Sequence, residues 1–241
     1  MMLAVALWAL TLSGQAKGPD NNADEPAKER ARVHGQLWKN TERLDGTIAK
    51  QLARSAGVIT IVDEEDRIEN DYAHQMLPAY PPMRMVEFAC MSDAVVAGRA
   101  ELGESHMTAD LSFIYSEWKF RITRVLQDNP KSSLVGMNEF QVVRAGGALA
   151  VNGRVVIGEE LHFPIFEVGD EYLLYLRYIP ETGFYKAIAG RSFDLSQGPI
   201  ADAPYMGRSW DKVPVDEVLR DAKAAISAAK NAAYCAKASN R

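Results

Sequence analysis

Cysteine is scarce in this sequence, and no apolar run is long enough to span a membrane. The 241 residues include only two cysteines, Cys90 and Cys235, so a C-x-x-C redox pair is excluded. A helix that crosses a bilayer needs about 20 predominantly apolar residues, and the run from Met2 to Leu12 is too short. We therefore expect a mature chain without a membrane-spanning helix.

The sequence also has no excess of positively charged residues over negatively charged ones. Lys and Arg number 27 against 32 Asp and Glu, a formal net charge of −5, and no basic stripe could neutralise a row of phosphates. Nucleic acid is therefore not an expected partner. The acidic stretch DEEDRIEND (63–71) lacks the glycine that a calcium loop needs at its bend, so a solvated loop is favoured there.

The residue patterns of common enzymes are also absent. The sequence contains no H-E-x-x-H, G-x-S-x-G, G-x-x-x-x-G-K or G-x-G-x-x-G, which excludes the zinc, serine-hydrolase, phosphate-binding and dinucleotide-binding sites that these patterns mark. Ser116 and Lys119 match S-x-x-K by letters, but an extended conformation places their side chains on opposite faces. We predict no catalytic residue, no metal ligand and no cofactor.

The four histidines are scattered along the chain. A surface or turn position is favoured for each of them: His34, His74, His106 and His162. His106 lies close in sequence to Glu104 and Asp110, which allows a hydrogen-bonded cluster or an adventitious metal site. Because this stretch connects two predicted strands, a solvated loop is favoured over both.

Residues 1–16, MMLAVALWALTLSGQA, have the pattern of a secretory signal peptide. Gly14 and Ala16 occupy the −3 and −1 positions of a cleavage site, although no Lys or Arg precedes the apolar run. A start codon further upstream and a buried N-terminal helix or strand are the alternatives. We expect a secreted or periplasmic protein. No cysteine stands directly after the cleavage site, so a lipid anchor there is not supported.

An oxidising compartment favours pairing of an even number of cysteines. A disulfide between Cys90 and Cys235 would close about 145 residues and stabilise the fold by around 4 to 5 kcal/mol in the chain-entropy model. Helical phase argues against it, because Cys235 would lie opposite the apolar face of an unbroken C-terminal helix. The sequence leaves a disulfide and two free buried thiols as open alternatives.

Hydrophobic periodicity predicts a leader region (17–82) before a β-rich domain (83–195). The polar stretch 17–30 indicates a disordered leader, and apolar residues then recur at helical spacing from Lys28 to about Ser55. Val58–Val62 fits a strand. The segment LPAYPPM (77–83) is typical of a linker. Residues 83–92 are predicted to form a short helix.

Alternating or continuous apolar residues predict the strands of that domain. They are Ala94–Leu102, Phe113–Leu126, Phe140–Arg144, Val155–Ile157, Glu171–Ile179 and Phe184–Ala189. The remainder, 196–241, is predicted as a loop and an amphipathic helix from Pro214 to about Ala236. We predict a mainly β protein with flanking helices (α+β), built on a small antiparallel OB-like barrel with a dry interior.

Four segments carry a family resemblance: SDAVVAGRA (92–100), FRITRVLQ (120–127), VVRAGG (142–147) and FEVGDEYLLYL (166–176). Together they resemble secreted bacterial proteins of unassigned function, which are distantly similar to the OB-like barrel of the netrin and tissue-inhibitor-of-metalloproteinase group. Inhibitors of that group present a mature N-terminal cysteine to a catalytic zinc. Cys90 lies 74 residues beyond the predicted cleavage site, so the same route would require a second processing event before it.

A non-enzymatic binding module is the favoured function. Core packing is favoured over ligand stacking for the aromatic set Phe113, Tyr115, Tyr172, Tyr175, Tyr178, Phe184 and Tyr185. The first candidate for a binding surface is the side of the strand Phe113–Leu126 that bears Tyr115, Glu117, Lys119 and Arg121, whose polar and aromatic mixture suits an extracellular or periplasmic protein or carbohydrate. The alternatives are a secreted hydrolase with a site assembled from distant residues and a metalloprotease-inhibitor-like protein.

Overall fold

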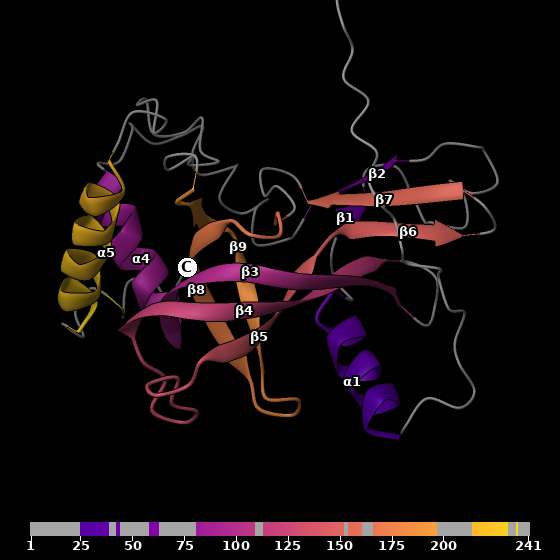
Figure 1. The fold of residues 1–241 in the computed structure, drawn as a ribbon, viewed down its shortest axis with the longest axis horizontal. Coiled ribbons are helices and arrows are strands. Elements are labelled where there is room, and N and C mark those ends of the chain that lie inside the picture. The colour runs from indigo at the N-terminus through magenta and orange to yellow at the C-terminus, as the bar shows by residue number, and fades with distance from the viewer. Residues whose placement is uncertain are drawn as a thin grey trace, which may run out of the picture.

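The computed structural model describes residues 25–38, 42–43, 58–62, 81–108, 113–151, 154–160, 166–196, 214–230 and 235. The elements are, in chain order, α1 (Glu25–Gln36), β1 (Glu42–Arg43), β2 (Val58–Val62), α4 (Pro81–Met91), β3 (Ala94–Met107), β4 (Ile114–Gln127), β5 (Glu139–Ala145), β6 (Gly147–Val151), β7 (Arg154–Glu160), β8 (Glu171–Ile179), β9 (Phe184–Asp194) and α5 (Val215–Ala229) (Figure 1). The predicted signal peptide, the acidic stretch 63–71, His74 and His162 lie outside these ranges. The prediction of a mainly β protein with flanking helices is confirmed.

Five strands close into a barrel in the order β3-β4-β5-β9-β8, with β8 pairing back to β3. All neighbours run antiparallel except β5 and β9, which are parallel at Val142↔Tyr185 and Val143↔Lys186. The first three barrel strands are therefore sequential neighbours, while the fifth inserts between the third and the fourth. This five-stranded Greek-key order is that of an OB-like barrel, as the strand pattern predicted.

Large side chains fill the interior of the barrel. Phe120 of β4 is fully buried, and its ring lies edge-on to those of Phe166 and Tyr172, with centroids 5.1 and 6.2 Å away. Trp118 lies flat against Gly103 of β3, where a Cβ atom would come within 2.6 Å of the indole. Side chains of this size fill the interior of a small barrel, so its outer face is the one that can meet solvent.

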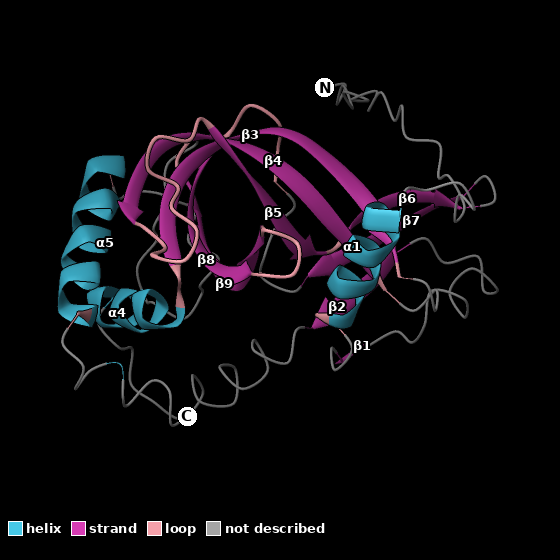
Figure 2. Ribbon diagram, turned by 90° about the horizontal axis from the view of Figure 1, so that it is seen from below, coloured by secondary structure: helices cyan, strands magenta, loops and turns pink. Residues whose placement is uncertain are grey.

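Helices α4 and α5 lie beside each other and cover the outside of the barrel at β8 and β9 (Figure 2). Apolar residues of the two helices pack there on Leu173, Tyr175 and Ile188. The inner face of β8 meanwhile lines the barrel core through Leu174 and Leu176. Both faces of β8 are thus buried, which explains why this strand is apolar at odd and even positions.

A disulfide joins Cys90, in the last turn of α4, to Cys235. The argument from helical phase assumed that the C-terminal helix continued through Cys235. Instead, α5 ends at Ala229 and Lys230 forms its C-cap. Of the two alternatives that the sequence left open, the structure contains the disulfide.

A second sheet, in the order β1-β2-β7-β6, lies next to the barrel and was not predicted. In Figure 1 its strands β6 and β7 extend from one end of the barrel. The strand Val155–Ile157 was expected to continue the barrel sheet, but β7 pairs antiparallel with β6 and parallel with β2. The prediction that it belongs to the barrel is wrong, because the chain leaves the barrel after β5.

Several predicted boundaries are also wrong. The continuous helix expected over residues 28–55 is wrong, because α1 covers Glu25–Gln36 and Glu42–Arg43 form β1. Residues 44–55 lie outside the described ranges. The stretch from Gly35 to Thr41 includes Gly, Asn and Thr, which are poor helix formers, and the apolar stripe is too thin to compensate. Helix α4 begins at Pro81 instead of Met83, because proline is tolerated in a first turn where no backbone donor is needed.

Strand β3 continues through His106 to Met107, so the solvated loop predicted at His106 is wrong. Its long antiparallel pairing with β4, down to Met107↔Ile114, keeps the extension in the sheet.

None of the helices in the described ranges has the length and apolar composition to span a membrane.

Candidate functional site

The predicted binding face lies on the outside of β4 and is divided into two parts. Tyr115, at one end of the strand, is 1% exposed, whereas the Arg121 side chain towards the other end is 68% exposed. Helix α1 packs over the first part and leaves the second part open. The expectation that all four residues form one accessible surface is therefore wrong for Tyr115 and restricted for Glu117, whose side chain is 11% exposed.

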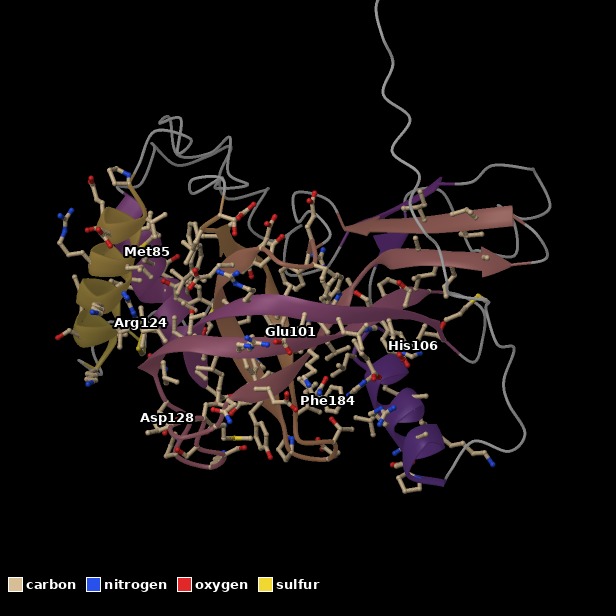
Figure 3. The ribbon with its side chains drawn as sticks, in the orientation of Figure 1. Met85, Glu101, His106, Arg124, Asp128 and Phe184 are labelled. Atoms are coloured by element: carbon tan, nitrogen blue, oxygen red, sulfur yellow. A yellow bond between two sulfur atoms is a disulfide. The ribbon has the colours of Figure 1, made fainter. Side chains whose placement is uncertain are left out.

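Glu117 is the centre of a cluster contributed by three elements. Its carboxylate lies 2.8 Å from His34 Nδ1 and 3.2 Å from Arg30 Nε, both on α1. The third partner is His106 of β3, whose Nε2 lies 3.9 Å away. Figure 3 labels His106 and Phe184, which flank one end of α1. The cluster fastens α1 to the barrel through polar contacts.

His34 is completely buried within this cluster. Its Nδ1 faces Glu117, its Nε2 lies 3.0 Å from Thr182 Oγ1, and its ring packs on Phe184 at 4.9 Å between centroids. The prediction of a surface or turn position for His34 is wrong. Because the Glu117 carboxylate can only accept, Nδ1–H donates to it and Nε2 accepts from the Thr182 hydroxyl, so neither ring nitrogen is available to a substrate.

Burial and charge oppose each other at Glu117. Burial alone would raise the pKa of its carboxyl group, but the His34 hydrogen bond and the charges of His106, Arg30 and His34 outweigh it and hold the pKa below 4.5. The ion is thus the stable form in the folded protein. Burial lowers the pKa of His106 below 6.5, although Glu117 and Glu104 partly oppose the effect.

Lys119 and Arg121 occupy the open part of the face. Lys119 pairs with Glu139 on β5, and Arg121 pairs with Glu101 on β3. Exposed ion pairs of this kind contribute little to stability. The two pairs place charges of both signs on this part of the face.

Most of the predicted aromatic set is in the core. Phe113, Tyr115, Tyr172, Tyr175 and Tyr185 are buried, while Tyr178 and Phe184 are partly buried. Core packing was the favoured interpretation of this set, and the structure agrees with it for these residues. Aromatic stacking on an extended ligand therefore has no exposed platform among them.

Sequence reasoning missed the contribution of α1 to this site. Val33, His34, Leu37 and Trp38 recur at helical spacing and turn inward together. That spacing was the available signal, since a histidine in phase with Val33 and Trp38 shares their buried face. Its carboxylate partner, 83 residues away, has no sequence signal.

An ordered loop between β4 and β5 was also missed. It covers Asp128–Asn138 and places Val135 and Met137 in solvent, 66% and 51% exposed.

Within the described ranges, no group of three His, Cys, Asp or Glu side chains could hold a metal ion. No protein-family model matches the chain, and no curated protein matches it.

Proposed function

We propose that this chain is an exported, non-enzymatic module that binds another protein through the outside of its barrel. The observation that carries the proposal is the filled interior, where Phe120, Phe166 and Trp118 occupy the volume that a ligand would need. A barrel without a lumen offers only its outer strands and loops to a partner. A distant relationship to the netrin and tissue-inhibitor-of-metalloproteinase group is part of the proposal, and the five-stranded order is compatible with it.

The cysteine chemistry supports export. Disulfides persist in oxidising compartments and are uncommon in the cytosol, and Cys90 is bonded to Cys235. This bond and the signal-peptide pattern of residues 1–16 support a secreted or periplasmic location.

A hydrolase is the second candidate, and the Glu117–His34 pair is the observation that favours it. A carboxylate that orients an imidazole at 2.8 Å supplies two of the three members of a catalytic triad. In this cluster, however, Thr182 occupies the nitrogen that would activate a nucleophile or water. The pair is thus built to hold α1 and not to transfer a proton to a substrate.

Metalloprotease inhibition by the route of that group has less support. It requires a free amine on the cysteine that meets the zinc. Cys90 instead continues α4 after Ala89, so its nitrogen is in a peptide bond within the helix. The chain would have to be cut between Ala89 and Cys90 before this route could operate.

The experiment is affinity capture from the native culture supernatant and periplasmic extract, combined with a panel of ester, peptide and glycoside substrates. We expect a protein that binds the purified chain saturably and no turnover on the panel. Turnover that disappears in His34→Ala, with no saturable partner, would overturn the proposal.

A further inference from the structure

A rigid apolar tip is displayed by the loop between β4 and β5. We infer that Val135 and Met137 form the contact by which this module enters an apolar pocket on its partner protein. The inference rests on the proposed function and deepens it by naming the surface. The tip is defined as residues Leu134–Met137.

The base of the loop is fixed by side-chain hydrogen bonds. Asp128 accepts from the backbone N–H of Leu134 and from the hydroxyl of Ser133, both at 2.7 Å. Asn129 is 1% exposed and accepts from the N–H of Lys131. Tyr185 of β9 donates to the carbonyl of Ser132 at 2.8 Å, which ties the loop to the strand that pairs with β5.

The tip itself is a tight turn anchored in the core. Leu134 is 2% exposed and belongs to the barrel interior. The N–H of Met137 donates to the carbonyl of Leu134, and Gly136 between them has φ +84°. A positive φ at the third residue of such a turn favours glycine, so the backbone is specified by the sequence.

This construction holds two apolar side chains in water at a fixed position. Loops that merely connect strands carry polar residues at their tips, whereas Val135 and Met137 are 66% and 51% exposed. A pre-ordered loop loses little conformational entropy on binding. Met is enriched at protein interfaces, and affinity concentrates in a few side chains that enter pockets.

Charge indicates the kind of partner. Residues Ser132–Asn138 include no charged residue. A membrane surface is disfavoured, because interfacial anchoring combines a larger apolar area with cationic side chains. A concave, uncharged pocket on a protein is the complementary surface, and binding through it should depend weakly on salt.

The test uses an aryl-ketone photocrosslinking residue at position 137, compared with position 168. Val168 is the matched control, since it is 65% exposed in another turn. Irradiation in the native extract should yield one protein joined to position 137 and not to position 168. That protein is then purified and titrated against the wild type, Val135→Ser/Met137→Gln and Val168→Ser.

We expect the double variant to bind at least about tenfold more weakly and Val168→Ser to bind like the wild type. Gly136→Ala keeps both side chains but strains the turn, because its φ of +84° favours glycine. The added Cβ itself meets no atom within 4 Å. The variant should also weaken binding, while the thermal midpoint falls by no more than about 5 °C. Raising NaCl from about 0.05 to about 0.5 M should change the affinity by less than about threefold.

The possible failures are distinguishable. A partner that binds all variants equally would overturn the tip and leave the proposed function standing. Absence of any saturable partner would overturn both. Crosslinking at position 137 to a second copy of the chain, or co-sedimentation with phosphatidylcholine–phosphatidylglycerol vesicles that requires Met137, would replace the partner protein with self-association or lipid.

Discussion

A carboxylate withdrawn from water needs compensating partners, and Glu117 has its partners on two other elements. Arg30 and His34 approach it from α1, and His106 approaches it from β3. Neutralising Glu117 removes the ion while keeping the shape of the side chain, which isolates the charge as the cause of any effect.

For Glu117→Gln we expect a loss of about 1–3 kcal/mol in the free energy of unfolding at pH 7. The folded pKa of Glu117 lies below 4.5, so its contribution is fully present above that pH and is lost as pH falls through the folded pKa. The wild type should therefore lose stability below about pH 4.5 more steeply than the variant. Urea unfolding across the pH range measures both curves.

Glu139→Gln is the control, because Glu139 pairs with Lys119 in solvent. We expect it to change the free energy of unfolding by less than about 1 kcal/mol at pH 7. Parallel curves for the wild type and Glu117→Gln below pH 4.5 would show that the ion does not fasten α1.

At the scale of elements, helices α4 and α5 are held by both packing and a covalent bond. Val218, Leu219 and Ile226 of α5 are buried against the barrel and α4. The disulfide closes a separation of 145 residues, the long-loop case in which a crosslink restricts the unfolded chain most. The disulfide lowers the entropy of the unfolded chain, while burial of the apolar face of α5 stabilises the folded protein.

Replacing both cysteines, Cys90→Ala/Cys235→Ala, should lower the free energy of unfolding by roughly 3 to 5 kcal/mol. The far-ultraviolet circular dichroism should remain that of the wild type, because the apolar face of α5 is intact. Urea titrations with and without a reductant measure the effect. The wild type under reductant should match the double variant, and a loss below about 1 kcal/mol would contradict the chain-entropy account.

Local patterns predicted elements well only where burial is local. Glu171–Ile179 was predicted with the bounds of β8, because a strand covered on both faces is apolar throughout. The continuous helix predicted from Lys28 to about Ser55 is interrupted, since α1 ends at Gln36 and Glu42–Arg43 form a strand. The parallel pairing of β2 with β7 joins residues about 100 positions apart and has no local signal.

The site was less predictable than the fold. The alternation along β4 identified the face that carries Glu117, but it could not show that α1 covers part of that face. The tip was missed because exposure at a loop is set by how the loop is held. Asp128 and Asn129 fix it through hydrogen bonds that span two to six residues, which hydrophobic periodicity does not detect.

At the scale of the whole molecule, the barrel and the second sheet differ in how they are supported. Strand β8 is hydrogen-bonded on both edges, to β3 and β9, and is buried on both faces. Strand β6 ends its sheet, since β7 is its paired neighbour in that sheet, and Ala148–Ala150 are only partly buried. Strand β8 is therefore supported on both edges and both faces, whereas β6 is supported on fewer sides. We expect the local stability of β6 to be lower than that of β8.

Amide hydrogen exchange should therefore divide the chain into two classes. The amides of Leu173, Leu174 and Leu176 should exchange only on global unfolding, whereas those of β6 should exchange through local opening that does not require the barrel to open. Hydrogen–deuterium exchange mass spectrometry at increasing urea separates the two, because global opening accelerates with denaturant and local opening does not. Equal protection of β6 and β8 at every urea concentration would mean that the two sheets unfold together, and the second sheet would then be a structural part of the barrel instead of an appendage to it.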